Sequence, residues 1–177
     1  MDLGLRGKGI IVVGGTSGMG LATAQVLAAE GAALVLAGRN RERAERAVAS
    51  LPDGGGSAQA MTVDVRHEGA VDRLLQDAVG VLGRLDGIAV MTGLTGHEPM
   101  TVTDAVWTEV FEDVLLGTVR AVRAALPHLV DRGGSIVTTA AYSIRAPDAA
   151  LRSGAAGESN WSPSRGVGFA IGCRKSM

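Results

Sequence analysis

The chain has little of several features that mark particular classes of protein. Among its 177 residues there is one cysteine, Cys173, so no disulfide forms within the chain and no oxidising compartment is implied. The formal net charge is −1, which gives no electrostatic reason to expect nucleic acid or an anionic membrane as a partner. No apolar run approaches a membrane span, and the first residues lack a basic-then-apolar signal segment. We therefore expect a cytoplasmic protein.

Clustered metal ligands are also missing from the sequence. The three histidines, His67, His97 and His128, are isolated from one another. Glu98 follows His97, but such a lone pair is more typical of a solvated turn, and no second group of ligands has suitable spacing. We expect no metal site.

What the chain does have is a repeated alternation of two apolar patterns. A length of 177 residues fits one domain, and 46% hydrophobic with 20% charged residues is a globular composition. Short β-branched runs alternate with segments of helical periodicity. The expected strands cover 10–13, 33–37, 58–65, 88–93 and 135–139, and the expected helices cover 18–30, 41–51, 67–81 and 103–130. This alternation predicts an α/β fold, a doubly wound parallel sheet of five strands in the order 3-2-1-4-5.

The turn after the first expected strand is the strongest local signal. The run 10–13 leads into Gly14, Gly18 and Gly20, and a helical pattern follows. Glycines there let the backbone approach a phosphate and let the helix press against the strand. Backbone N–H groups and the positive end of the helix dipole then face the anion. The alternative is an ordinary glycine-rich loop. The predicted binding residues of this turn are Gly14, Thr16, Ser17, Gly18, Met19 and Gly20.

The spacing of these glycines resembles the Thr-Gly-x-x-x-Gly-x-Gly turn of the short-chain dehydrogenase/reductase family, with Val13 in place of the usual Thr. The Leu85-Asp86 turn and Gly87 also match the pattern of that family. The resemblance covers residues 1–148 or so. It implies a nicotinamide dinucleotide bound across the carboxyl ends of the first and fourth strands. It also implies hydride transfer between this cofactor and a small carbonyl or alcohol substrate.

The end of the second expected strand bears on the choice of cofactor. In dinucleotide-binding units an acidic residue here binds the ribose hydroxyls of NAD, whereas an Arg accommodates the 2′-phosphate of NADP. Gly38 occupies the acidic position, and Arg39 follows it. A guanidinium meets a phosphate in bidentate fashion, so NADP is favoured over NAD. The alternative is that Arg39 is one more charge of the exposed run 39–43.

The resemblance places residues after the third and fourth strands beside the cofactor. Asp64 and Val65 would lie next to the adenine ring, with Asp64 accepting a hydrogen bond from the exocyclic amine. Alternatively, or at the same time, Asp64 caps the next helix, which we expect to start near His67. The Asn-Asn-Ala-Gly segment of the family reads Val-Met-Thr-Gly at 90–93. Only Gly93 remains, and it would let the backbone pass close to the cofactor.

The catalytic residues of the family have no counterparts at the aligned positions, and we predict no catalytic residue. The substrate-binding Ser aligns with Ala141 and the helix Asn with Val114. Ser143 would replace that Ser only if its loop shifts. The Tyr-x-x-x-Lys pair, which protonates the carbonyl oxygen, would fall near Gly154 and Glu158.

No Tyr-x-x-x-Lys pair occurs anywhere in the sequence. The one tyrosine, Tyr142, has Ala146 four residues later, and the only lysines are Lys8 and Lys175. A tyrosine with its ordinary pKa near 10 needs the neighbouring lysine to act as a proton donor.

The composition changes at about Ala150. Residues 150–166 are rich in Gly, Ser, Ala and Arg without helical or strand periodicity, and only 167–172 hint at a short strand. We predict a Rossmann-like domain over 1–149 and an irregular tail over 150–177. Without the later strands of the family, the fifth strand is expected to be an open edge. The helix from Thr103 is expected to expose an apolar face, and we therefore expect at least a dimer.

Three functions are compatible with this sequence. The first is an NADP-dependent reductase or dehydrogenase, and the second is a non-catalytic nucleotide-binding module, acting alone or beside an intact paralogue. The third is a remnant whose reading frame shifted near codon 150, which the abrupt change of composition favours. We expect family membership and NADP binding with negligible turnover.

Overall fold

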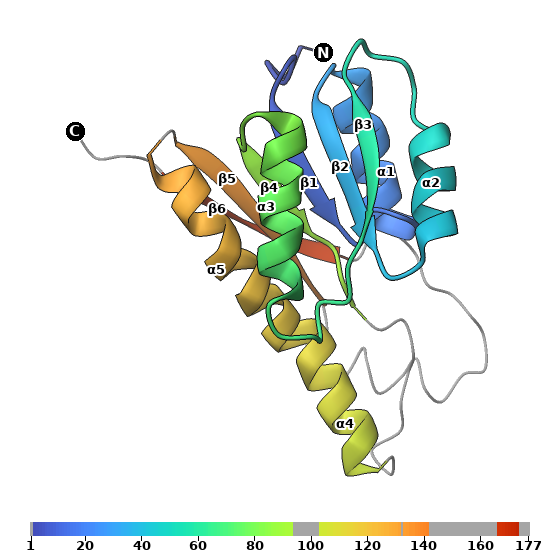
Figure 1. The fold of residues 1–177 in the computed structure, drawn as a ribbon, viewed down its shortest axis with the longest axis vertical. Helices are drawn as coiled ribbons and strands as arrows, with labels where there is room; N and C mark the ends of the chain where they lie inside the picture. Colours follow the sequence, from blue (N-terminus) through green and yellow to red (C-terminus); the bar gives the residue numbers. More distant parts are fainter. Residues whose placement is uncertain (1, 94–102, 132, 142–165, 174–177) are drawn as a thin grey trace.

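The computed structural model describes residues 2–93, 103–131, 133–141 and 166–173 (Figure 1). Within these ranges one sheet has the strand order β3-β2-β1-β4-β5-β6. The strands are β1 (Gly9–Val13), β2 (Ala33–Gly38), β3 (Ala58–Thr62), β4 (Gly87–Val90), β5 (Gly134–Ala141) and β6 (Gly166–Cys173). The helices are α1 (Gly18–Ala29), α2 (Arg41–Ala49), α3 (Ala70–Leu82), α4 (Asp104–Val110), the π-helix η1 (Phe111–Leu116) and α5 (Gly117–Val130).

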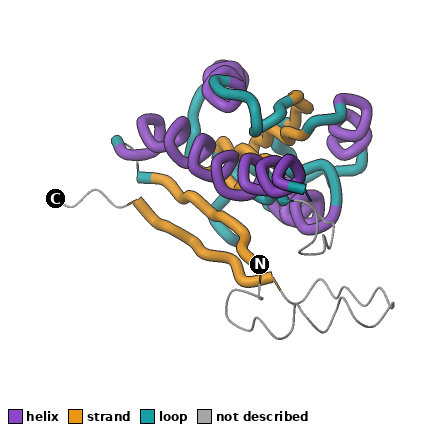
Figure 2. The backbone as a smooth tube through the Cα atoms, turned by 90° about the horizontal axis from the view of Figure 1, so that it is seen from below, coloured by secondary structure: helices purple, strands orange, loops and turns teal. Residues whose placement is uncertain are grey.

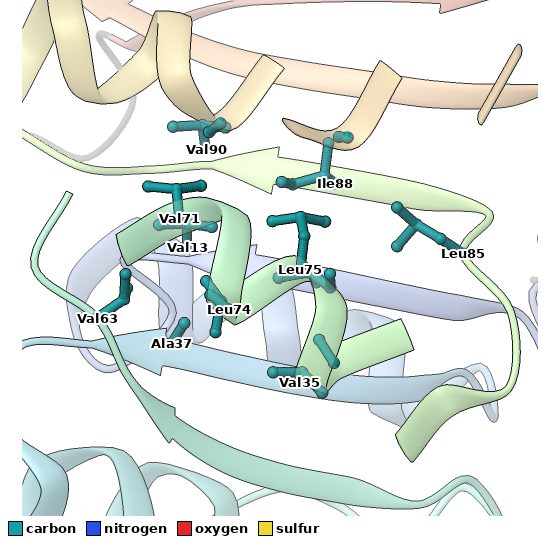
Figure 3. Close-up of a cluster of buried hydrophobic side chains, with 14 of the residues drawn as sticks. Val13, Val35, Ala37, Val63, Val71, Leu74, Leu75, Leu85, Ile88 and Val90 are labelled. Carbon is teal, nitrogen blue, oxygen red and sulfur yellow. The ribbon is translucent and has the colours of Figure 1, made fainter. Parts of the chain in front are cut away.

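The first five strands are parallel, and their order 3-2-1-4-5 confirms the prediction. Helices α1 and α2 cover one face of the sheet, and α3 and α5 cover the other (Figure 1). The central strand β1 is buried at all five positions, as expected for a strand covered on both faces. Figure 3 shows Val71, Leu74 and Leu75 of α3 packed over β1, β2 and β4. Packing on both faces therefore holds in place the sheet whose carboxyl edge carries the candidate site.

The expectation of an open edge at β5 is wrong. Strand β6 pairs with β5 in antiparallel register, from Gly134 opposite Cys173 to Ala141 opposite Gly166 (Figure 2). The backbone of 166–173 thereby supplies the hydrogen bonds that an edge strand would otherwise leave to solvent. The hint of a strand at 167–172 is confirmed, and the strand is one residue longer at each end.

Some expected boundaries differ from those of the structure. The strand expected over 58–65 ends at Thr62, and the one expected over 88–93 ends at Val90. The helix expected over 103–130 is continuous through Gly117, but its middle turn is π-helical. A π-helical turn changes which residues face the core without breaking the helix. The π-helical turn therefore affects which side chains of this helix lie near the candidate site.

The amino edge of the sheet is held by Asp86. Its carboxylate accepts the Gly9 N–H at 2.9 Å and two hydrogen bonds from the Arg84 guanidinium at 2.6 Å each. Lys8 Nζ lies 3.4 Å from the same carboxylate. Because Asp86 precedes β4 and Gly9 opens β1, these bonds align the starts of the two central strands. The opposite, carboxyl edge is where the predicted site residues lie.

Candidate functional site

Four turns meet at the carboxyl edge of the sheet, after β1, β2, β3 and β4. The chain continues from β1 to β2 on one side and from β4 to β5 on the other, so the strand order reverses between β1 and β4. Such a switch point leaves a crevice between diverging connections, where ligands of doubly wound sheets bind. Every predicted binding residue lies in the segment that follows one of these strands: Gly14, Thr16, Ser17, Gly18, Met19 and Gly20 after β1, Arg39 after β2, Asp64 and Val65 after β3, and Gly93 after β4.

The turn after β1 accepts only glycine at two positions. Gly14 has a positive φ of 81°, and a Cβ there would lie 2.7 Å from the carbonyl oxygen of Met91. A Cβ on Gly20 would lie 2.2 Å from the carbonyl oxygen of Gly14, so the first turn of α1 rests directly on the loop. Gly18 has φ 52° and open space around its Cβ position. The tight turn and the close helix packing expected from the sequence are both present.

The start of α1 leaves backbone donors available. Ser17 at the N-cap is extended, with φ −164° and ψ 171°, and its side chain makes no capping hydrogen bond. The first N–H groups of a helix have no partner within the helix, and the first turn of α1 carries no acidic residue. Ser17 and Gly18 are exposed. This helix start fits a phosphate group chemically and sterically.

The end of β2 is shaped by Thr16. A Cβ on Gly38 would lie 2.7 Å from Thr16 Cγ2 and 3.1 Å from Thr16 Oγ1. Thr16 therefore occupies the space that a side chain at position 38 would need. Arg39, the next residue, is exposed. The end of β2 thus presents a cation at 39 and leaves no room for a carboxylate at 38.

Asp64 is held by Arg66 within one turn of chain. Its carboxylate accepts Arg66 Nε at 2.9 Å and Nη2 at 2.6 Å, and it also accepts the Arg66 backbone N–H at 3.1 Å. These side-chain hydrogen bonds lower the pKa of Asp64 to about 2. The guanidinium of Arg66 also forms an ion pair with Glu109 of α4. The expectation that Asp64 caps the next helix is wrong, because α3 begins at Ala70 with Gly69 at its N-cap.

The helix from α4 to α5 packs on the Asp64–Arg66 turn through two residues that the sequence analysis missed as site residues. Arg120 Nη1 donates to the carbonyl oxygens of Val65 and Arg66, at 2.9 Å each. A Cβ on Gly117 would lie 2.6 Å from Val65 Cγ2, so the helix approaches the turn closely. Gly117 is the one signal of this approach in the sequence, because glycine is unfavourable within a helix unless a neighbour leaves no room for a side chain. Arg120 has no local signal, because its partners are carbonyl groups remote in sequence.

Asp113 is the only charged side chain that is buried among the described residues, with 4% of its surface exposed. It lies in the π-helical turn η1. Burial raises the pKa of its carboxyl group, while the charges of Arg39 and Arg66 oppose that rise. This side chain was also missed from the sequence, since an acid within a helical pattern is ordinarily solvated.

The turn after β4 holds an unpaired hydroxyl. Thr92 Oγ1 is buried and has no hydrogen-bond partner among the described residues. Its backbone N lies near Gly14, at 3.0 Å from the Cβ position there. Gly93 is exposed, and no atom of the described residues lies within 4 Å of its Cβ position. A buried hydroxyl beside the glycine turn, without a partner among the described residues, suits a hydrogen bond to a polar ligand.

Several residues that the sequence pattern singled out lie outside the described ranges. These are His97, Glu98, Tyr142, Ser143, Ala146, Gly154, Glu158 and Lys175. In the parts of the chain that the structure covers, no three His, Cys, Asp or Glu side chains are grouped as a metal site. None of the helices described here combines the length and apolar character needed to cross a membrane.

A doubly wound parallel sheet with a glycine turn at its switch point is characteristic of the Rossmann-like class of α/β proteins. Comparison with protein families makes this more specific. The family model for short chain dehydrogenases matches residues 8–152. The chain belongs to the short-chain dehydrogenase/reductase family.

Similar proteins have oxidoreductase names. The chain is 35% identical to the meso-2,3-butanediol dehydrogenase of Serratia marcescens over 138 residues, which are 77% of this chain and 54% of that protein. It is also 35% identical to the short-chain dehydrogenase/reductase ABA4 of Pyricularia oryzae over 144 residues, 78% of this chain and 53% of that one. The chain thus spans about half the length of these curated relatives.

Solved structures agree with this assignment. A hydroxysteroid dehydrogenase from Escherichia coli superimposes with a TM-score of 0.71 at 27% identity, covering 76% of this chain and 57% of that one. A 7α-hydroxysteroid dehydrogenase in complex with NADH and 7-oxo glycochenodeoxycholic acid gives a TM-score of 0.75 at 25% identity, covering 80% of this chain and 56% of that one. The family binds nicotinamide dinucleotides, and its dehydrogenases transfer hydride.

Proposed function

We propose that this chain binds NADP(H) at the carboxyl edge of its sheet, in preference to NAD(H). The observation that carries the proposal is the close approach of the Thr16 side chain to Gly38. The Thr16 side chain fills the space where an acidic side chain at 38 would have to lie to bind ribose hydroxyls. Arg39 is exposed beside it as the cation that a 2′-phosphate requires.

The other predicted residues take complementary parts in this proposal. The first N–H groups of α1, from Gly18 to Gly20, bind the pyrophosphate. Asp64 and Val65 border the adenine, and the Asp64 carboxylate, which Arg66 holds in place, accepts a further hydrogen bond from its exocyclic amine. The backbone at Gly93 passes close to the nicotinamide side. When bound, the nicotinamide group supplies hydride chemistry, and the chain's own residues bind and orient it.

We further propose that the chain as it stands turns over little or no substrate. The aligned catalytic positions hold Val114 and Ala141, and the only tyrosine has Ala146 where the family has lysine. The second candidate is an active reductase or dehydrogenase of small carbonyl or alcohol substrates, which the names of the relatives favour. The third is a frameshifted remnant, favoured by the composition of 150–177. The division into a domain over 1–149 and a separate tail, and the cytoplasmic location, stay predictions.

The cofactor proposal is tested by titrating the full chain with NADPH and with NADH, because one structural relative was solved with NADH. We expect NADPH to bind about tenfold tighter or more, since hydrogen bonds to a charged group contribute about 1.5–3 kcal/mol. Arg39→Met should remove most of this difference and leave the dissociation constant of NADH within about twofold. Arg41→Met, also exposed, is the matched control and should leave both constants unchanged. Tighter binding of NADH to the unmodified chain would overturn the preference.

We also propose that the chain forms a homo-oligomer through the helix from α4 to α5. Large apolar side chains at helical spacing are exposed along it: Trp107, Phe111, Val114, Leu115, Val119, Leu126 and Val130. Monomeric proteins seldom expose a contiguous stripe of this kind. Sedimentation equilibrium of the full chain and of Leu115→Glu tests the proposal. A monomer mass for the unmodified chain would refute it.

A further inference from the structure

One face of the helix from α4 to α5 is directed at the turn that follows β3. Glu109, Asp113 and Gly117 are spaced four residues apart along it. Glu109 pairs with Arg66, and Gly117 contacts the side chain of Val65. Asp113, between them, is therefore held against the same turn, and its 4% exposure agrees with this position.

The same turn lies next to the end of β2. Gly38 is opposite Thr62 in the pairing of β2 with β3, and the Val63 N–H donates to the Gly38 carbonyl oxygen at 3.0 Å. Arg39 consequently leaves the sheet alongside the segment that leads to Asp64. Asp113, packed against the turn that this segment enters, and Arg39 thus flank the same short stretch of chain, within the range over which their charges interact.

The charged groups around Asp113 come from three elements. Arg39 follows β2, Asp64 and Arg66 follow β3, and Glu109 lies one turn earlier on α4. Arg66 is already bonded to Asp64 and Glu109, which share its charge. Among the described residues no hydrogen bond reaches the Asp113 carboxylate, so Arg39 and Arg66 attract its charge only through space, against the opposing effect of burial.

We propose that Asp113 is a specificity-determining residue of the dinucleotide site, which weakens the preference for a 2′-phosphorylated cofactor by partly neutralising Arg39. The inference rests on the proposed binding of NADP(H). A buried carboxylate near the cation proposed to bind the 2′-phosphate repels that phosphate, and the burial of Asp113 reduces the screening of this repulsion by water. A dinucleotide without the 2′-phosphate places no such charge near Asp113. Asp113 therefore lowers the affinity for NADPH relative to the affinity for NADH.

The test is Asp113→Asn, which removes the charge and keeps the shape of the side chain. At pH 8 and low salt, we expect the dissociation constant of NADPH to fall by about three- to tenfold and that of NADH to stay within about twofold. Glu112→Gln removes the same charge from the neighbouring, less buried position and should change neither constant. Should Asp113→Asn fail to fold, Asp113→Ser removes the same charge with a smaller side chain.

The outcomes separate this inference from the proposed function. If Arg39→Met abolishes the preference for NADPH but Asp113→Asn leaves the ratio unchanged, the inference fails and the proposed function stands. Weaker binding of NADPH to Asp113→Asn would show that Asp113 supports Arg39, which also overturns the inference. If the unmodified chain binds neither dinucleotide, both fail together.

Discussion

The turn after β1 and the end of β5 lie at the same edge of one sheet, yet they place different demands on the sequence. In the turn, Gly14 and Gly20 have no room for a side chain, and the expected ligand contacts are made by backbone N–H groups. At the end of β5, Ala140 and Ala141 keep the register with β6 through their backbone, which does not depend on a side-chain oxygen. The fold therefore requires glycine in the proposed binding half of the site, the turn after β1, whereas the proposed catalytic half, at the end of β5, can change without cost to the sheet.

The largest expected effect is that of Gly20→Ala, which would break the binding half. The new Cβ would lie 2.2 Å from the Gly14 carbonyl oxygen, so α1 or the turn must move. We expect a loss of about 1–3 kcal/mol in the free energy of unfolding and a loss of NADPH binding of about tenfold or more. Urea unfolding and NADPH titration measure both effects.

Gly80→Ala is the matched control for this substitution. Gly80 is an exposed position of α3, and nothing lies within 4 Å of its Cβ position. We expect it to stabilise the protein by about 0.5–1 kcal/mol with unchanged binding. If both variants behave alike, the close packing of Gly20 is not what holds the turn.

A smaller, pH-dependent effect is expected at Asp64. Because Arg66 lowers the pKa of the folded-state carboxyl group from 3.8 to about 2, the ion pair stabilises the fold above the unfolded value. This stabilisation is lost as the pH falls through about 2. Asp64→Asn should destabilise the protein by about 1 kcal/mol at neutral pH, a figure reduced for solvent screening. The unfolding free energies of the unmodified protein and of Asp64→Asn should converge as the pH falls below 3.8 towards 2. A constant difference at every pH would contradict this account.

The smallest effect should come from the β5 side. Thr139 Oγ1 donates one long hydrogen bond, 3.5 Å, to the Val90 carbonyl oxygen. Thr139→Val keeps the shape of the side chain, and we expect a change within about 0.5 kcal/mol in stability. The dissociation constant of NADPH should stay unchanged, in contrast to Arg39→Met. Weakened NADPH binding would place part of the binding site on β5 and blur the comparison.

The parallel sheet and the gathering of the site could be predicted because both follow from local patterns. The β-branched runs identify the buried strands, and the carboxyl ends of parallel strands necessarily share one edge. Gly14, Arg39, Asp64 and Gly93, although remote in sequence, therefore meet there. The positions of the strand ends were enough to bring them together.

The remaining features depend on tertiary contacts without a local signal. Arg120 can donate hydrogen bonds to the Val65 and Arg66 carbonyl oxygens only after helix α5 has packed against the turn that follows β3. The burial of Asp113 follows from the packing of the π-helical turn, which periodicity of 3.6 does not reveal. The antiparallel pairing of β6 joins segments separated by a long stretch of chain. The alternative in which Asp64 caps the next helix is wrong because a turn intervenes, with Gly69 at positive φ, which has no clear marker in the sequence.

The central claim is that this chain keeps the dinucleotide site and lacks turnover, and one sample tests both parts. Protein and NADPH are mixed, binding is followed by the fluorescence of the nicotinamide, and oxidation is then followed by absorbance after addition of ketones, including a 2,3-diketone and an oxosteroid. We predict saturable binding that Arg39→Asp weakens, and no oxidation above that of a protein-free blank. Protein-dependent oxidation of NADPH, or the absence of saturable binding, would contradict the account.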